Sequence, residues 1–165
     1  ILRKGGIHEG REGFSFAHDS FFLFPTRFHA QAEHVREGDV ETLAEWQTGD
    51  TVHITHRAEA VHAVTLTDWQ KVAALTSYHI LTEATVRDRF DWQGKGMNSG
   101  SIHVALVRVF KLAEPWQLTY TSALGGCRNW IKLPPAPEAS ESPVIAEEKF
   151  AEITKVFEDL ASVTA

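Results

Sequence analysis

The sequence predicts an α+β domain, with a mixed or partly closed β-sheet of at least five strands, flanking helices and a C-terminal amphipathic helix. Three observations lead to this class. An apolar content of 43% and a charged content of 23% in 165 residues are typical of one folded domain. Strand-like and helix-like segments do not alternate strictly, which disfavours a doubly wound parallel sheet. An apolar helical stripe follows a proline-rich segment near the end.

Short apolar or alternating segments give the expected strands. The chain opens in a strand at residues 1–3 and lacks an initial Met, so we expect further residues upstream of Ile1. Phe21-Phe22-Leu23-Phe24 suits a strand buried on both faces. Alternation predicts strands at 51–56 and 60–66. The longest strand, 102–112, is expected to end before Glu114-Pro115.

Capping residues give the expected helices. One or two helical turns are expected over 28–35, after Thr26. Asp68 and Thr82 are N-cap residues for helices that run to about Leu75 and Phe90. Ser142-Pro143 predicts the start of the last helix. We therefore expect an α+β domain at 1–133, a linker at 134–142 and a C-terminal helix at 143–162, which could dock on this chain or on a second copy.

Charge and hydropathy narrow the class of protein. The net charge of -6 argues against indiscriminate binding to nucleic acid. The charge is uneven, because residues 37–59 hold six acids against Arg57 alone, whereas 60–134 hold eight bases against five acids. No segment approaches the roughly 20 apolar residues of a membrane-spanning helix. The lone Cys127 rules out an internal disulfide and fits a cytoplasmic protein.

Histidine and cysteine spacing gives little support for a metal or a cofactor. Among the nine histidines, His53 and His56 would point to opposite sides of a strand, and no His-Glu-x-x-His motif exists. We expect neither a metal nor a cofactor. Cys127 is interpreted as a small thiol beside a packed Trp130, although a Cys-His nucleophile pair stays open.

Arg108 is the most informative single residue, because it lies in the most apolar strand, where an unpaired charge would be costly. It must reach an acid, a ligand or the rim of the sheet. Glu9, Asp19 and Glu83 are candidate partners. An ion pair and a functional contact are equally compatible with the sequence.

The candidate ligand-binding residues are polar side chains expected to meet at one end of the sheet. A lysine beside two glycines, Lys4-Gly5-Gly6, could cradle an anion. Trp92 has the aromatic and basic surroundings that single-stranded nucleic acid or a flipped base requires. The full set is Arg3, Lys4, His18, Thr26, His29, Gln31, Arg89, Trp92, Lys95, Arg108 and Arg128.

Five segments carry a resemblance to a known family: LRKGGI, HDSFFLFPTRFHAQ, YHILTEATVRDRFDWQGKG, ALVRVFKLAEP and GGCRNWIKL. Together they resemble the bacterial domain of unknown function numbered 1802, over residues 1–133 and the start of the last helix. Asn129 and Phe28 depart from the family pattern. The resemblance implies an association with restriction–modification and a nuclease partner, but no activity. WQTGDTVHI also resembles a turn and strand of PUA-like barrels, which often bind RNA or modified bases.

Two functions remain open at this point. The first is a module that recognises nucleic acid or a modified base, through Arg and Lys contacts to phosphate and an aromatic wall for a base. The second is an enzyme acting on a small anionic substrate, with His18 or His29 as general base and Arg108 as charge clamp.

Overall fold

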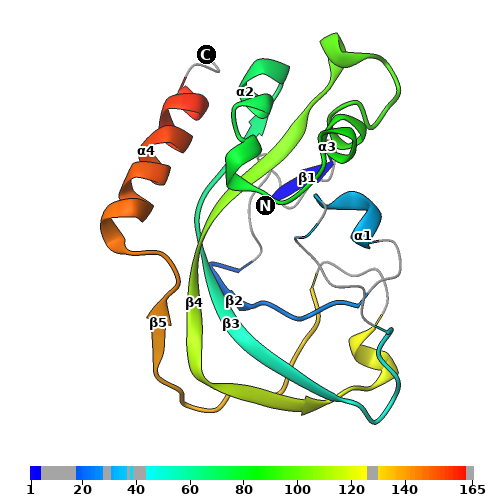
Figure 1. Cartoon of the computed structure of the whole chain (residues 1–165), viewed down its shortest axis with the longest axis vertical. Helices are drawn as coiled ribbons and strands as arrows, with labels where there is room; N and C mark the ends of the chain where they lie inside the picture. Colours follow the sequence, from blue (N-terminus) through cyan, green and yellow to red (C-terminus); the bar gives the residue numbers. More distant parts are fainter. Residues whose placement is uncertain (5–17, 28–30, 37, 39–43, 126–129, 163–165) are drawn as a thin grey trace.

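The computed structural model describes residues 1–4, 18–27, 31–36, 38, 44–125 and 130–162, and these form an α+β fold around one antiparallel sheet. The sheet is built on two long strands, β3 (Thr51–Leu66) and β4 (Ile102–Thr119). The outer edge of β3 pairs with β2 (Ser20–Phe22). The other edge of β4 pairs with β1 (Leu2–Lys4) near one end and with β5 (Glu141–Pro143) farther along (Figure 1).

The predicted α+β class is confirmed, but the described strands form an open sheet in the order β1-β4-β3-β2 and do not close into a PUA-like barrel. β2 and β1 are the end strands of this order, and each pairs over only three residues. Register shifts in β3 lie between Ile54 and His56 and between Ala60 and His62. Such irregularities increase strand twist and bend, and β3 and β4 curve together along the molecule (Figure 1).

The two strands predicted at 51–56 and 60–66 are one continuous strand, β3. The polar segment between them looked like a break in the apolar pattern. In the structure it continues the ladder, with Arg57, Ala58 and Glu59 opposite Phe110, Val109 and Arg108. Arg57 of this segment bonds to Ser20 of β2, to Glu141 of β5 and to Glu59 of its own strand.

β4 continues through Pro115, so the prediction that it ends before Glu114 was wrong. The register explains why proline is tolerated there. Ile54 pairs with Trp116 and His56 with Lys111, so residues 112–115 lie opposite Thr55 alone. Proline lacks an amide hydrogen, and an irregular stretch of this kind has no ladder bond for it to break.

The Ser142-Pro143 signal marks an edge strand rather than a helix start. Pro143 lies in β5 opposite Phe110, while the amide of the next residue, Val144, donates to the carbonyl of Val109 at 2.9 Å. Proline is accepted on an edge strand because its nitrogen need not donate. The last helix, α4, runs from Glu147 to Ser162, and two acids in its first turn suit the positive end of the helix dipole.

The other helices are short, and the two predicted caps are confirmed. α1 (Gln31–His34), α2 (Trp69–Ala73) and α3 (Glu83–Phe90) flank the sheet. The Asp68 carboxylate accepts from the amide of Gln70 at 2.8 Å, and the Thr82 hydroxyl accepts from the amide of Thr85 at 3.2 Å. Three 3-10 turns complete the described elements, at Thr76–Tyr78, Met97–Ser99 and Ser122–Leu124.

Two apolar clusters hold these layers together. One lies where α2, α3 and α4 meet the sheet, and it contains the buried side chains of Leu66, Phe90 and Phe157. The other lies on the far half of β3 and β4, around Ile54 and Trp116. Helix α4 therefore packs on this chain through its apolar face.

Candidate functional site

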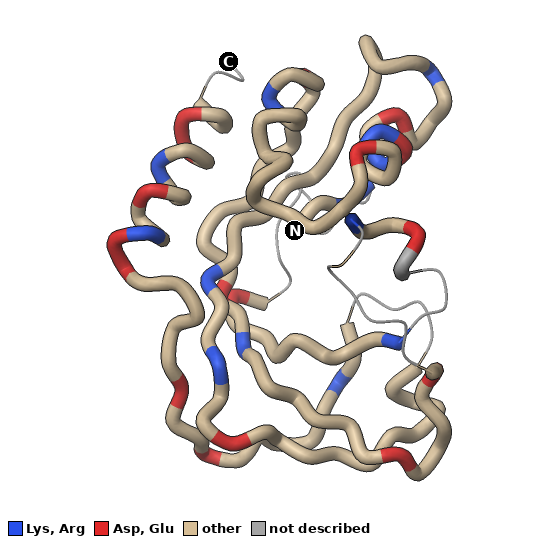
Figure 2. The backbone as a smooth tube through the Cα atoms, in the orientation of Figure 1, with Lys and Arg blue, Asp and Glu red and all other residues tan. Residues whose placement is uncertain are grey.

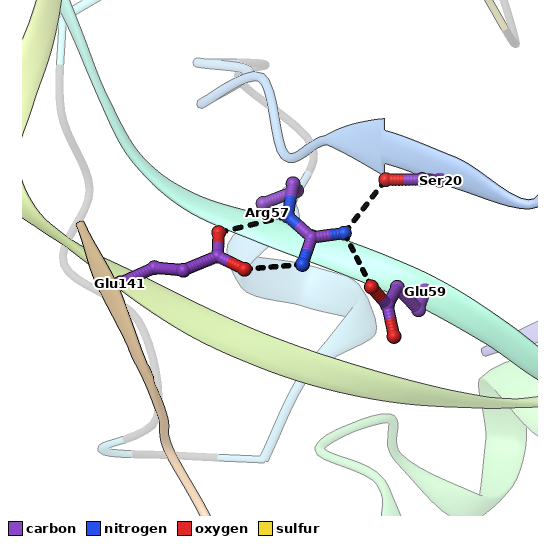
Figure 3. Close-up of polar contacts among 4 residues, drawn as sticks. All are labelled: Ser20, Arg57, Glu59 and Glu141. Carbon is purple, nitrogen blue, oxygen red and sulfur yellow. Dashed lines mark hydrogen bonds and ion pairs between the residues drawn. The ribbon is translucent and has the colours of Figure 1, made fainter. Parts of the chain in front are cut away.

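Arg57 on β3 is the centre of the most extensively bonded polar cluster among the described residues (Figure 3). Its guanidinium binds both carboxylate oxygens of Glu141, with 2.8 Å between Nε and Oε2. It also donates to Ser20 Oγ at 2.7 Å and to Glu59 Oε1 at 2.8 Å. The ring of Phe110 lies 4.6 Å from the guanidinium.

This cluster joins strands β2, β3 and β5, and it engages the guanidinium of Arg57 in four hydrogen bonds. The bond to Glu141 raises the pKa of Arg57 and lowers the pKa of Glu141. Sequence reasoning identified Arg57 only as the lone base in an acidic segment. Its partner lies 84 residues away along the chain, and no local pattern indicates such a pairing. We interpret the cluster as structural, because four bonds already hold the guanidinium in place.

Arg108 pairs with Glu147 at the start of α4 and not with Asp19 or Glu83, while Glu9, the third predicted partner, lies outside the described residues. Its two terminal nitrogens donate to the two carboxylate oxygens at 3.0 and 2.6 Å. The guanidinium also lies 4.7 Å from the ring of Phe150. The expected cost of an unpaired charge is thus avoided by an ion pair that ties α4 to β4. Of the two roles that the sequence left open, the geometry favours the structural one.

A different group of candidate residues lies where β1 and α3 meet the start of β4. Lys4 is exposed and lies opposite Ile102, the first residue of β4. Trp92 and Lys95 belong to the loop that leads from α3 into that strand. The Trp92 side chain is 41% exposed. We call Lys4, Trp92 and Lys95 the loop surface.

Arg89 supports the loop surface rather than adding a free charge to it. Its guanidinium donates to the carbonyl oxygen of Leu2 at 2.6 Å, which ties α3 to β1. Burial lowers the pKa of Arg89. The neighbouring Arg3 lies in β1 opposite His103 and is half-buried.

Asp91 fixes the shape of the loop. Its carboxylate accepts from the amides of Lys95 and Gly96 at 2.8 and 3.0 Å, and its carbonyl accepts from the amide of Gly94 at 2.9 Å. Gly94 and Gly96 have φ angles of 65° and 90°, which other residues adopt only at a cost. The Asp91 charge is therefore directed at backbone amides, and within the described chain no acid pairs with the Lys95 ammonium.

The remaining candidates are not part of the loop surface. His18 is exposed and packs edge-on against Trp130, with 5.1 Å between ring centroids. Thr26 is exposed in the segment after β2. Gln31 begins α1. His29, Arg128 and Cys127 lie outside the described residues, as do Gly5 and Gly6. The structure thus distributes the predicted pocket residues over at least three places.

Basic and acidic residues are interspersed over most of the fold, and α4 carries both signs (Figure 2). Within the described ranges, no three His, Cys, Asp or Glu side chains gather as metal ligands would. None of the helices in these ranges is both long and apolar enough to span a bilayer.

Comparison with known proteins identifies the family. The model of the domain of unknown function DUF1802 matches residues 1–156. A search of curated proteins and a search of solved structures found no match. Because the match includes α3, the loop surface, β4, β5 and most of α4, it covers nearly every element described above. The chain belongs to the family described as a domain of unknown function, DUF1802.

Proposed function

We propose that this chain recognises nucleic acid, including modified bases, through the loop surface, and that it assists a nuclease partner. The observation that carries the proposal is the exposed side chain of Trp92 on the same short loop as the exposed Lys95, a loop that Asp91 holds in shape. A base can stack on an exposed indole, and neighbouring lysines can contact phosphates. A rigid loop loses little entropy on binding. The resemblance to a family linked with restriction–modification agrees with this role.

The charge of the protein sets the expected strength of binding. Two exposed lysines, Lys4 and Lys95, give about two phosphate contacts. For single strands, two contacts correspond to a slope of about -1.4 in log K against log salt. The net charge of -6 opposes nonspecific attraction. We therefore expect salt-sensitive binding in which stacking on Trp92 gives much of the affinity.

The alternative of an enzyme with Arg108 as charge clamp has less support. Arg108 is engaged with Glu147 through both terminal nitrogens. An incoming anion would have to displace that carboxylate. His18, the described candidate for the general base, packs edge-on against Trp130.

Fluorescence anisotropy with short single- and double-stranded DNA and RNA, with and without modified bases, tests the proposal at two salt concentrations. Trp92→Ala should weaken binding by about 1–3 kcal/mol, which is a loss of affinity of about 5- to 150-fold. Trp92→Phe should retain much of the affinity, since a ring remains. Lys95→Gln should weaken binding and reduce the salt slope, whereas Lys111→Gln, on an exposed residue of β4 away from this surface, should do neither. Absence of binding at low salt, or equal binding by Trp92→Ala, would refute the proposal.

A further inference from the structure

Asp91 is an acid in the loop that carries Trp92 and Lys95, the residues that we propose contact a base and a phosphate. A negative charge close to a bound phosphate repels it, so the charge of Asp91 alone would weaken binding. The hydrogen bonds of its carboxylate indicate a different role.

The carboxylate of Asp91 is bonded to the backbone of its own loop. Oδ1 accepts from the amides of Lys95 at 2.8 Å and Gly96 at 3.0 Å, and Oδ2 accepts from the amide of Gly96 at 3.0 Å. The carbonyl of Asp91 accepts from the amide of Gly94 at 2.9 Å. Hydrogen bonds to an ionised acceptor are about twice as strong as neutral ones. Asp91 therefore ties the middle of the loop to its beginning.

The loop depends on such bonds because its sequence is flexible. Gly94 and Gly96 have φ angles of 65° and 90°, so a glycine stands on each side of Lys95. Glycine loses more conformational freedom on ordering than any other residue. Without the Asp91 carboxylate, the segment 92–96 would therefore sample many conformations, and the side chains of Trp92 and Lys95 would no longer be held in one arrangement.

The two ends of the loop are fixed independently of Asp91. The amide of Ser101 donates to the carbonyl of Phe90 at 2.9 Å. Gly100 packs so closely on the buried Phe90 that an added Cβ would lie 2.3 Å from its ring. The amide of Ser99 donates to the carbonyl of Gly96 at 3.0 Å. Loss of the Asp91 carboxylate should therefore loosen the segment 92–96 and leave the rest of the fold in place.

We propose that Asp91 is a positioning residue that raises the affinity of the loop surface for nucleic acid, although it is an acid. The inference rests on the proposed function, because it concerns the same loop. A segment that is ordered before binding loses less entropy when the ligand arrives. Fixing the backbone of one residue corresponds to a factor of about 5–30 in affinity, so the loss of this order should weaken binding about tenfold.

The electrostatic effect of Asp91 has the opposite sign and is smaller. Coulomb's law in water gives a gain of about twofold when a negative charge about 8 Å from a phosphate is removed. Salt reduces this gain further. A substitution of Asp91 should therefore weaken binding if the carboxylate orders the loop, and strengthen binding if only its charge matters.

Fluorescence anisotropy at low salt, with a short fluorescein-labelled single-stranded DNA and an RNA of the same sequence, measures the sign. Asp91→Ala should bind about tenfold more weakly than the unaltered chain. Asp91→Asn loses the same charge but keeps one oxygen that can accept from the amides, so it should bind more tightly than Asp91→Ala. Asp88→Ala and Asp88→Asn are matched controls at an exposed acid of α3, and they should leave the affinity unchanged or raise it by up to about twofold.

Nuclear magnetic resonance relaxation provides a measurement that requires no nucleic acid. In the unaltered chain, the backbone amides of residues 94–96 should have order parameters of about 0.85, as rigid backbone does. Asp91→Ala should lower them below about 0.6, while the amides of Phe90 and Ser101 keep their values. Thermal unfolding of Asp91→Ala should change little, because both ends of the loop stay fixed.

The outcomes distinguish this inference from the proposed function. No binding by the unaltered chain would refute the proposed function, and this inference with it. If the unaltered chain binds, equal or tighter binding by Asp91→Ala would overturn only the role of Asp91. The same conclusion would follow if Asp88→Ala weakened binding as much as Asp91→Ala, or if the order parameters of residues 94–96 did not change in Asp91→Ala.

Discussion

Gly100→Ala should destabilise the fold through one close contact. Gly100 is buried where the chain enters β4, and its φ and ψ of -77° and 162° suit any residue, so backbone strain is not involved. A Cβ there would lie 2.3 and 2.4 Å from two ring carbons of Phe90 and 2.8 Å from its carbonyl oxygen. Phe90 is fully buried and packs edge-on against Trp69 at 5.5 Å, so the ring has little room to move.

Overpacking of this kind costs about 1–3 kcal/mol. In a chain of this size, 1 kcal/mol corresponds to about 2–4 °C in Tm, so the expected loss for about 2 kcal/mol is about 4–8 °C. Urea unfolding followed by tryptophan fluorescence would measure the free energy of unfolding. Equal stability of Gly100→Ala and the unaltered chain would refute the packing argument.

A double-mutant cycle separates the ring contact from other causes. Phe90→Val removes both ring carbons that the new Cβ would meet, so the cost of Gly100→Ala should fall by at least half in that background. Gly94→Ala is the matched control. Gly94 has a φ of 65° with nothing within 4 Å of an added Cβ, and its cost of about 1–2 kcal/mol should be the same in both backgrounds.

Further predictions concern the Arg57 cluster and the cap of α3. Arg57→Met should cost about 1 kcal/mol in urea unfolding, because it removes the bidentate ion pair with the exposed Glu141. The pKa of Glu141 is lowered in the folded state, so its contribution is present above its ordinary value of 4.5 and is lost as pH falls below it. Glu141→Gln should therefore flatten the acid side of the stability profile, and an unchanged profile would contradict this. Thr82→Ala should cost about 1 kcal/mol and Thr82→Ser almost nothing, as thermal unfolding can show, because the Thr82 hydroxyl caps α3.

Local signals predicted the parts of the fold that depend on nearby residues. The caps at Asp68 and Thr82 act within three residues, and both are present as expected. Pro115 and Pro143 misled the sequence reasoning because proline was interpreted as the end of a strand or the start of a helix. Whether a strand tolerates proline depends on its pairing with the partner strand. The register of β3 and β5 against β4 cannot be predicted from the residues next to each proline.

The predictions of candidate site residues were limited in the same way, because local sequence does not show which distant segments meet. The sequence required a partner for Arg108, and the structure provides one, but Glu147 comes from a helix that the sequence could not place. Arg57 was missed as a cluster centre because Glu141 lies on β5, which was expected to be a linker. Trp92 and Lys95 were identified because both lie on one short loop. Contacts between residues that are distant in sequence can be predicted only when the strand order is known. That order depends on which strands pair with the edge of β4.

The edge of β4 shows this dependence on topology. β1 covers its first residues and places Lys4 opposite Ile102, where the loop that carries Trp92 and Lys95 ends. β5 covers a later stretch, and this pairing brings Glu141 to Arg57, so the polar cluster depends on a strand far along the chain.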